Sequence, residues 1–164
     1  MQAVLKAHGV TNRKLWLCGS FEGLPPPEPD KYPDDEEDVH HTYGILAVSK
    51  AEVINNFKRY GLLDDQVQFV EGFFENTLPT LNVDKVSLLR LDGDMYGSTI
   101  VTLNSLYNKV SVGGYVIIDD YGLGPCRKAV EEFRNSHDIN DEIMQIDASS
   151  VFWQKSCCSL LPIR

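Results

Sequence analysis

Short apolar runs alternate along the chain with longer segments of mixed polarity. The apolar runs predict four strands, which are residues 14–18, 67–70, 86–91 and 115–118. The intervening segments predict three helices, which are residues 49–61, 99–110 and 125–136. Strands that alternate with helices through mostly short connections are typical of a doubly wound, mainly parallel α/β sheet.

Particular residues mark the ends of these elements. Ser49 is a residue type that caps helix N-termini, and Gly61 is a type that ends helices. By the same reasoning, we expect Gly113 and Gly114 to end the helix over residues 99–110. These signals divide the chain into compact elements with short turns between them.

The two ends of the chain add one helix and one hairpin to this pattern. Residues 1–9 have the character of the last turns of an amphipathic helix that Gly9 closes. Residues 142–146 and 151–154 predict an antiparallel hairpin at the edge of the sheet.

Two segments do not fit the alternation of strands and helices. Residues 25–38 are rich in proline and acid, a composition that does not build a core, so we expect a long loop. We expect residues 25–47 to form a lid. Residues 71–79 (EGFFENTLP) are expected to be a loop that carries two aromatic residues. The chain as a whole, residues 1–164, reads as a single domain that contains this lid.

Composition narrows the classes of partner. The net charge of −9 and the pI of about 4.8 argue against nucleic acid or an anionic membrane, since both require a basic surface. No apolar run approaches the roughly 18 residues of a membrane span, and no signal peptide is expected. The four cysteines lack the spacing of a metal site, which favours reduced thiols and a cytoplasmic location.

Carboxylates follow two of the predicted strands at the points where these strands end. Asp92 and Asp94 follow residues 86–91, and Asp119 and Asp120 follow residues 115–118. If the two strands are neighbours, these acids meet at the carboxyl edge of the sheet, where ligands of such sheets bind. Crowded carboxylates repel one another unless a cation neutralises them, and hard oxygen ligands suit magnesium or calcium. The alternative is that some of the acids cap the following helices or turns, as Asp120 could.

Four segments together resemble the macrocin O-methyltransferase family: LRLDGDMYGST, GGYVIIDDYG, SFEGLPPP and KRYGLLDDQV. The resemblance covers nearly the whole chain. It implies a class I methyltransferase (Rossmann-like) fold with strands in the order 3-2-1-4-5-7-6. It also implies O-methyl transfer from S-adenosylmethionine, with Mg²⁺, to a hydroxyl of a small sugar or polyol-type natural product.

The resemblance further implies roles for particular residues. The metal ligands would be Asp92, Asp119 and Asp120, and Asp92 would also be the general base. The cofactor-binding residues would be Gly19, Ser20, Phe21, Glu22, Gly72, Phe73, Phe74, Asp92 and Gly93. The acceptor would lie near His40, His41 and Tyr43. Simple core packing remains the alternative for the two phenylalanines, and a solvated loop remains the alternative for the two histidines.

Two departures from the family pattern affect these expectations. The family's first strand and glycine-rich cofactor loop are expected before residue 1, and Gly19 stands where the family usually has Asp. We therefore expect weak cofactor binding, and unpaired strand edges that favour a homo-oligomer. The alternative function is a non-catalytic relative that acts as a binding or structural module. A phosphate-handling magnesium enzyme is disfavoured because no nucleophile and lysine accompany the acids.

Overall fold

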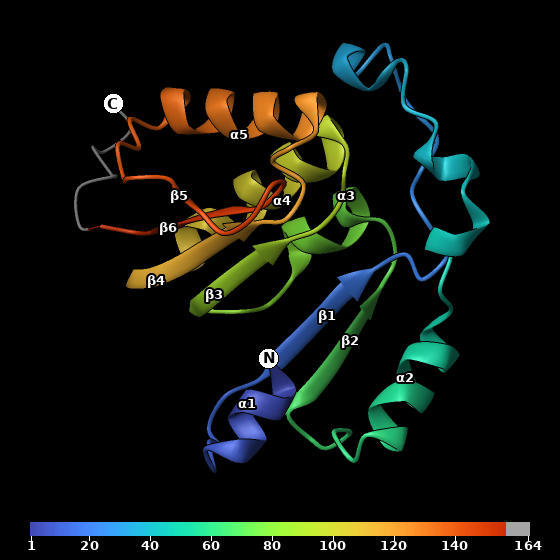
Figure 1. Ribbon diagram of the computed structural model, residues 1–164, viewed down its shortest axis with the longest axis vertical. Coiled ribbons are helices and arrows are strands. Elements are labelled where there is room, and N and C mark those ends of the chain that lie inside the picture. The colour runs from blue at the N-terminus through green and yellow to red at the C-terminus, as the bar shows by residue number, and fades with distance from the viewer. Residues whose placement is uncertain (157–164) are drawn as a thin grey trace. The chain divides into compact units, whose positions relative to one another are not determined.

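The computed structural model describes residues 1–156, which divide into two compact units (Figure 1). The first unit combines Met1–Pro26 with Val39–Thr77. The second combines Pro27–Asp38 with the chain from Leu78 onward. The acidic, proline-rich segment Pro27–Asp38 is therefore part of the second unit, although its neighbours in sequence on both sides belong to the first.

The first unit is a pair of parallel strands with short helices. Its helices and strands are α1 (Gln2–Ala7), β1 (Leu15–Gly19), α2 (Lys50–Arg59), β2 (Val67–Glu71) and α3 (Phe74–Thr77). Two 3₁₀ turns, His40–Thr42 and Gly44–Leu46, precede α2. Ser49 caps α2 as expected, because its hydroxyl accepts a hydrogen bond from the Glu52 N–H at 3.2 Å. Gly61 follows the helix with a φ of 63°, a conformation that favours glycine.

The second unit is a four-stranded sheet with two long helices. The strand order is β3 (Val86–Leu91), β4 (Val110–Ile118), β6 (Val151–Gln154) and β5 (Met144–Gln145). The helices are α4 (Tyr96–Leu106) and α5 (Gly124–Ser136), which pack against each other. Three 3₁₀ turns complete the unit: Pro33–Asp35, Leu78–Thr80 and Tyr107–Lys109. The fully buried core includes Leu103 of α4, Val116 and Ile118 of β4, Val130 of α5 and Trp153 of β6.

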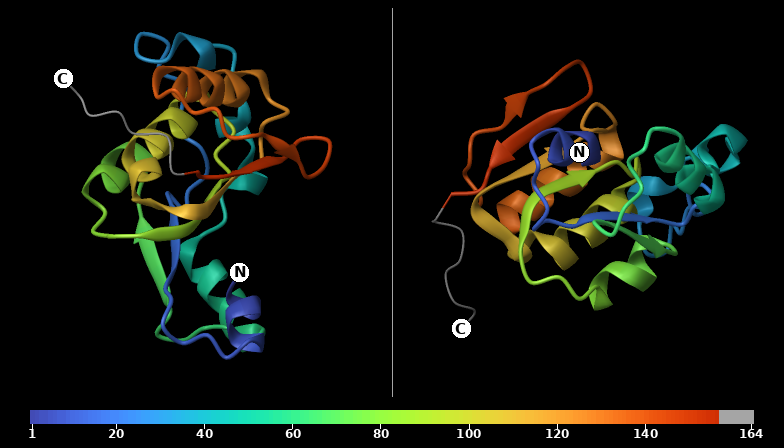
Figure 2. Two further views of the ribbon diagram at one scale, coloured as in Figure 1. Left: turned by 90° about the vertical axis from the view of Figure 1, so that its left-hand side faces the viewer. Right: turned by 90° about the horizontal axis from the view of Figure 1, so that it is seen from below.

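The strand order within each sheet agrees with the expected methyltransferase order. Counted in that order, β1 and β2 are strands two and three, and they pair in parallel. The strands β3, β4, β6 and β5 then reproduce the order 4-5-7-6, with β3 parallel and β6 antiparallel to β4. The predicted C-terminal hairpin is present and is drawn in red in both views of Figure 2. No helix in the described part of the chain is long and apolar enough to cross a membrane.

The prediction for Gly113 and Gly114 was wrong. The helix α4 ends at Leu106, and both glycines lie inside β4 rather than at the helix end. The register between β3 and β4 is irregular at this point, and Gly113 has a φ of +79°. A Cβ on Gly114 would lie 2.8 Å from the Ser111 carbonyl oxygen. The glycines therefore accommodate a bulge in a long strand, which the turn-like sequence concealed.

Two further expectations need correction. Residues 71–79 are not a loop throughout, because α3 and the 3₁₀ turn Leu78–Thr80 occupy most of them and Leu78 is buried. The segment over residues 25–38 is not wholly a surface excursion, because Asp35 is only 1% exposed. Its composition correctly predicted irregular structure but did not predict the burial of Asp35.

Candidate active site at the ends of β3 and β4

The pairing of β3 with β4 brings the two acidic sequences to one edge of the sheet. Leu91 and Ile118 are register partners, and each is the last residue of its strand. The ladder continues by one further bond, from the Asp119 N–H to the Leu91 carbonyl oxygen at 3.0 Å. Asp92 and Asp119 therefore emerge side by side, as the positions of the acids in the sequence predicted.

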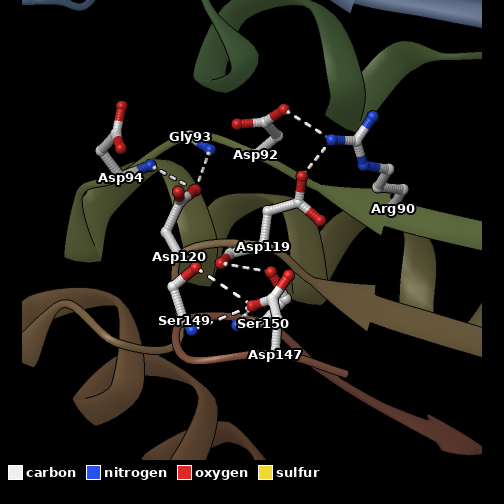
Figure 3. Close-up of polar contacts among 9 residues, drawn as sticks. All are labelled: Arg90, Asp92, Gly93, Asp94, Asp119, Asp120, Asp147, Ser149 and Ser150. Carbon is white, nitrogen blue, oxygen red and sulfur yellow. Dashed lines mark hydrogen bonds and ion pairs between the residues drawn. The ribbon is translucent and has the colours of Figure 1, made fainter. Parts of the chain in front are cut away.

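Arg90 joins these two carboxylates (Figure 3). Its Nη2 donates to Asp92 Oδ2 at 3.2 Å and forms a short ion pair with Asp119 Oδ2. The hydrogen bond to Asp119 raises the pKa of Arg90 above its ordinary value. In the sequence, Arg90 is the one charged residue in the apolar run over residues 86–91, and no role was predicted for it. The available signal was its position two residues before Asp92, which places both side chains on one face of β3.

Asp120 holds the loop that follows β3. Its Oδ2 accepts hydrogen bonds from the Gly93 N–H at 3.0 Å and from the Asp94 N–H at 3.1 Å (Figure 3). The alternative considered for Asp120 was stabilisation of the turn after its own strand. These two hydrogen bonds instead connect the end of β4 to the loop after β3, so that Asp120 helps to fix the backbone beside Asp92.

The loop before β6 contacts the backbone of Asp119. This contact was not predicted from the sequence. The Ser150 hydroxyl donates to the Asp119 carbonyl oxygen at 3.1 Å (Figure 3). Ser150 is positioned by Asp147, whose Oδ1 accepts from the Ser149 and Ser150 N–H groups at 3.0 and 2.8 Å. These bonds lower the pKa of Asp147 below its ordinary value. The sequence DASS is a common turn sequence, so nothing in it indicated a supporting role.

The electrostatics of the site favour a basic Asp92. Partial burial is the main cause that raises the pKa of Asp92 above its ordinary value, and the charge of Asp120 adds to it. Arg90 opposes this rise, whereas Asp119 reinforces it. The Asp92 side chain is nevertheless 59% exposed, so that a substrate group can reach it. An accessible carboxylate with a raised pKa is suited to accept a proton.

The chemical types of these residues fit a divalent cation, but their arrangement is not a coordination shell. Among residues 1–156, no group of three or more His, Cys, Asp or Glu side chains is arranged to hold a metal ion. Arg90 pairs with Asp92 and Asp119, and one oxygen of Asp120 is engaged by backbone N–H groups. The three carboxylates supply the hard oxygen donors that Mg²⁺ prefers.

The residues predicted to bind the cofactor lie mostly in the first unit. The loops after β1 and β2 meet there, since the Gly72 N–H donates to the Gly19 carbonyl oxygen at 2.9 Å. The Ser20 hydroxyl accepts from the Glu22 N–H at 3.1 Å, and the Phe21 ring lies 6.2 Å from the Phe69 ring. Phe73 and Phe74 are half-buried, and Phe74 begins α3.

The residues predicted to lie near the acceptor also belong to the first unit. The His40 ring meets the Tyr43 ring edge-on at 5.5 Å, whereas His41 is exposed. The structure thus groups the predicted residues in two sets, one in each unit. The binding roles of these residues remain predictions.

The fold and the acidic edge define the class of protein, which is an α/β methyltransferase domain. The family described as macrocin-O-methyltransferase (TylF) matches residues 1–155. The chain belongs to this family.

Individual relatives support this assignment. The chain is 48% identical over 158 residues to demethyldecarbamoylnovobiocin O-methyltransferase of Streptomyces niveus, a match that covers 95% of this chain and 60% of the relative. It is 45% identical over 158 residues to mycinamicin III 3''-O-methyltransferase of Micromonospora griseorubida, covering 94% of this chain and 62% of the relative. The chain thus spans about three fifths of the length of the curated relatives it matches.

Solved structures agree with the fold. The O-methyltransferase NovP superposes with a TM-score of 0.93 at 48% identity, over 95% of this chain and 65% of that protein. The calicheamicin methyltransferase CalS11 superposes with a TM-score of 0.70 at 16% identity, over 93% of this chain and 65% of that protein. The second likeness concerns the fold alone.

Proposed function

We propose that this domain transfers a methyl group from S-adenosylmethionine to a hydroxyl of a sugar or polyol-type natural product, with a divalent metal ion. Membership of the macrocin-O-methyltransferase family supports the reaction class. The activities of two relatives indicate the kind of acceptor, since one is a mycinamicin III 3''-O-methyltransferase and another is a 4'-O-methyltransferase of a rhamnosyl-tetracenomycin. The acceptor of this chain is therefore a small molecule.

The single observation that carries this proposal is the position of Asp92. It follows β3 directly, it is accessible, and its pKa is raised by partial burial and by Asp120. Asp92 accepts the proton of the acceptor hydroxyl, and the hydroxyl oxygen then becomes the nucleophile. S-adenosylmethionine would supply the electrophilic methyl group and leave as S-adenosylhomocysteine, and Mg²⁺ would lower the pKa of the acceptor hydroxyl.

The remaining residues of the site bind and orient. Asp92, Asp119 and Asp120 would hold the metal ion, and Arg90 keeps Asp92 and Asp119 together. Asp120 also fixes the loop that contains Gly93. Most of the rate enhancement in such a reaction comes from positioning and electrostatics, because the methyl donor is already reactive.

The cofactor side of the proposal rests on the loops after β1 and β2. Gly19 and Ser20, at the end of β1, would lie near the ribose. An aromatic ring from Phe73 or Phe74 would flank the adenine. A cytoplasmic location follows from the reduced state expected of the cysteines. Self-association through strand edges remains a prediction.

A non-catalytic binding module is the second candidate function. The observation that favours it is Gly19, which stands where the resemblance leads us to expect the carboxylate that binds the ribose. Losing such a carboxylate would cost roughly 1.5–3 kcal/mol per hydrogen bond. A domain that cannot retain the methyl donor would keep the fold without the reaction.

Isothermal titration with S-adenosylmethionine and S-adenosylhomocysteine, each with and without Mg²⁺, tests whether the loop after β1 binds the cofactor, as the first candidate requires. We expect weak binding by the chain and tighter binding by the Gly19→Asp variant, by roughly tenfold to a hundredfold. The substitution is sterically permitted, because a Cβ on Gly19 meets no atom within 4 Å. Gly19→Asn is the matched control, because it adds a side chain of the same size without the negative charge and should gain less affinity. If Gly19→Asp binds neither ligand more tightly than the original chain, the assignment of this loop to the cofactor is wrong.

A further inference from the structure

The acidic segment Pro27–Asp38 contains a buried carboxylate that neither the family resemblance nor the proposed chemistry uses. Asp35 is 1% exposed. Its Oδ1 accepts a hydrogen bond from the Tyr96 N–H at 2.7 Å, and its Oδ2 accepts from the Gly97 N–H at 2.8 Å. These are the first two residues of α4, so a side chain 61 residues earlier in the sequence supplies the cap of this helix.

The position that would normally cap α4 is occupied by a core residue. Met95 is the N-cap of the helix and makes no side-chain hydrogen bond there. It is only 3% exposed, so its side chain anchors the start of the helix in the core. The first N–H groups of a helix need acceptors from outside the helix. Asp35 provides two of them because the local sequence cannot.

Further contacts fasten the segment around Asp35 to the two long helices. The Tyr32 ring covers Gly97 so closely that a Cβ at this glycine would lie 2.6 Å from the ring. The Tyr32 and Tyr96 rings are 6.1 Å apart. The Lys128 Nζ of α5 donates to both oxygens of Asp34 at 2.7 and 2.9 Å. The segment is therefore held at several points as well as by the buried carboxylate.

The same short stretch of backbone is held from its other end by the candidate active site. Asp120 accepts from the N–H groups of Gly93 and Asp94, whereas Asp35 accepts from those of Tyr96 and Gly97. Between them, the Met95 N–H donates to the Gly93 carbonyl oxygen at 2.5 Å. Asp120 and Asp35 thus accept hydrogen bonds from four N–H groups of residues 93–97. This stretch follows Asp92 directly and includes the start of α4.

We propose that Asp35 is a positioning residue, which holds the loop over residues 93–97 and thereby the backbone that presents Asp92. The coupling between Asp35 and this loop stands on the contacts alone. Its consequence for methyl transfer rests on the proposed function. The acidic segment then serves as a fixed support of the site.

Amide hydrogen exchange, measured by NMR on the ¹⁵N-labelled chain, tests the coupling. Asp35→Asn keeps the size of the side chain but replaces one acceptor oxygen with a donor. We expect exchange at Gly93 and Asp94 to become faster by about tenfold, although Asp120, their own acceptor, is unchanged. The matched control is Asp34→Asn, which removes the ion pair with Lys128 in the same segment and should leave both amides unchanged.

A second variant reaches the same contact from the helix. Gly97→Ala places a methyl group against Tyr32 and should push the segment away from α4 while Asp35 stays intact. Helix propensity alone would make this change stabilising, so the two effects have opposite signs. We expect Gly97→Ala also to accelerate exchange at Gly93 and Asp94.

The core amide of Val116, in a residue that is 0% exposed, reports on global unfolding. The proposal is overturned if the variants accelerate exchange only at Tyr96 and Gly97, which would make Asp35 a local cap. It is equally overturned if Val116 accelerates as much as Gly93, which would make the effect global. Turnover of Asp35→Asn in a complete active form is a separate readout, where we expect a lower kcat with an unchanged KM for the cofactor. Absence of turnover in the protein without any substitution would refute the proposed function, whereas the exchange result would still stand.

Discussion

The two acidic regions of the second unit differ in what surrounds their carboxylates. The segment over residues 30–38 holds six of the 24 acidic residues in the sequence, and its buried member, Asp35, faces two backbone N–H groups. The strand-end cluster has fewer acids, yet Asp92 is near both Asp119 and Asp120, and a single guanidinium joins two of the three. The density of acids along the sequence therefore does not show where carboxylates crowd in space.

This difference separates a structural carboxylate from a chemical one. Burial raises the pKa of Asp35 above its ordinary value, but the Gly97 and Tyr96 N–H groups oppose this rise, and hydrogen bonds to both of its oxygens suit a permanent support. In the cluster, partial burial and then the neighbouring carboxylates raise the pKa of Asp92, and Arg90 compensates only in part. A group kept in an unfavourable charge environment contributes little to the fold and is available for chemistry.

The largest effect should come from Asp92→Asn, measured as turnover in a complete, active form of the protein. The amide can neither accept the proton nor serve well as a metal ligand. We expect a loss of roughly 10²–10⁴ in kcat, which is the usual contribution of a general base. The fold should survive, as a circular dichroism spectrum would show.

The acidic segment supplies the control for this experiment. Asp34→Asn changes an acid that is partly exposed and paired with Lys128, and it should leave turnover close to that of the original protein. If Asp92→Asn retains more than about a tenth of the rate, the change in the barrier is below about 1.4 kcal/mol. Such a result would remove Asp92 from the role of base.

The next effect concerns stability, and here the larger loss is expected in the segment over residues 30–38 rather than in the strand-end cluster. Asp35→Ala leaves two N–H groups at the start of α4 without their acceptor, one of them buried. We expect a loss of about 2–4 kcal/mol in the free energy of unfolding. Thermal unfolding should show a fall in Tm of about 5–12 °C for a chain of this size.

Asp34→Ala is the comparison for that measurement. Its ion pair with Lys128 lies at the surface, where such pairs contribute little, so the fall in Tm should be much smaller. Equal losses for the two variants would mean that the burial of Asp35 has no energetic consequence.

The smallest effect is a gain of stability for Asp92→Asn at neutral pH. A folded pKa raised above the ordinary value of 3.8 means that the folded state favours the protonated carboxyl. This contribution to stability is complete below the unfolded pKa and is lost as the pH rises through the folded pKa. The ionised Asp92 therefore destabilises the fold at neutral pH, and Asp92→Asn should have a slightly higher Tm there.

Asp147 is a useful comparison, because its pKa shift and the resulting effect on stability have the opposite sign. Its pKa is lowered by the N–H groups of Ser149 and Ser150, so its stabilising contribution is present above the unfolded pKa and is lost as the pH falls through the folded pKa. Asp147→Asn should lower the Tm at neutral pH. Variants that shift the Tm in the same direction would refute the electrostatic contrast between these two carboxylates.

The strand ends were predictable from the sequence because each is a local pattern. An apolar run that breaks into acids marks both the end of a buried strand and the residues that emerge there, as Asp92 and Asp119 do. The role of Asp35 was not predictable, because its partners lie 61 and 62 residues away and depend on tertiary packing. Gly113 and Gly114 misled for a related reason, since a bulge and a turn use the same residue type.

The partners of the predicted acids were also missed. Arg90 was visible as a lone charge in an apolar strand, and the alternation of side chains placed it beside Asp92. Ser150 offered no such signal, because its contact is with the backbone of Asp119. Side-chain periodicity can reveal a neighbour on the same strand, whereas contacts between separate loops require the fold.

The most direct test of the account is to measure at which of the two acidic regions a divalent cation binds. Mn²⁺ takes oxygen ligands as Mg²⁺ does and broadens the NMR signals of nearby amides. In a titration of the ¹⁵N-labelled chain, we predict that Mn²⁺ first broadens Gly93, Asp119 and Asp120, and that Asp92→Asn weakens this effect. Broadening that begins in residues 30–38 and spares the ends of β3 and β4 would contradict the assignment of the metal-assisted site to Asp92, Asp119 and Asp120.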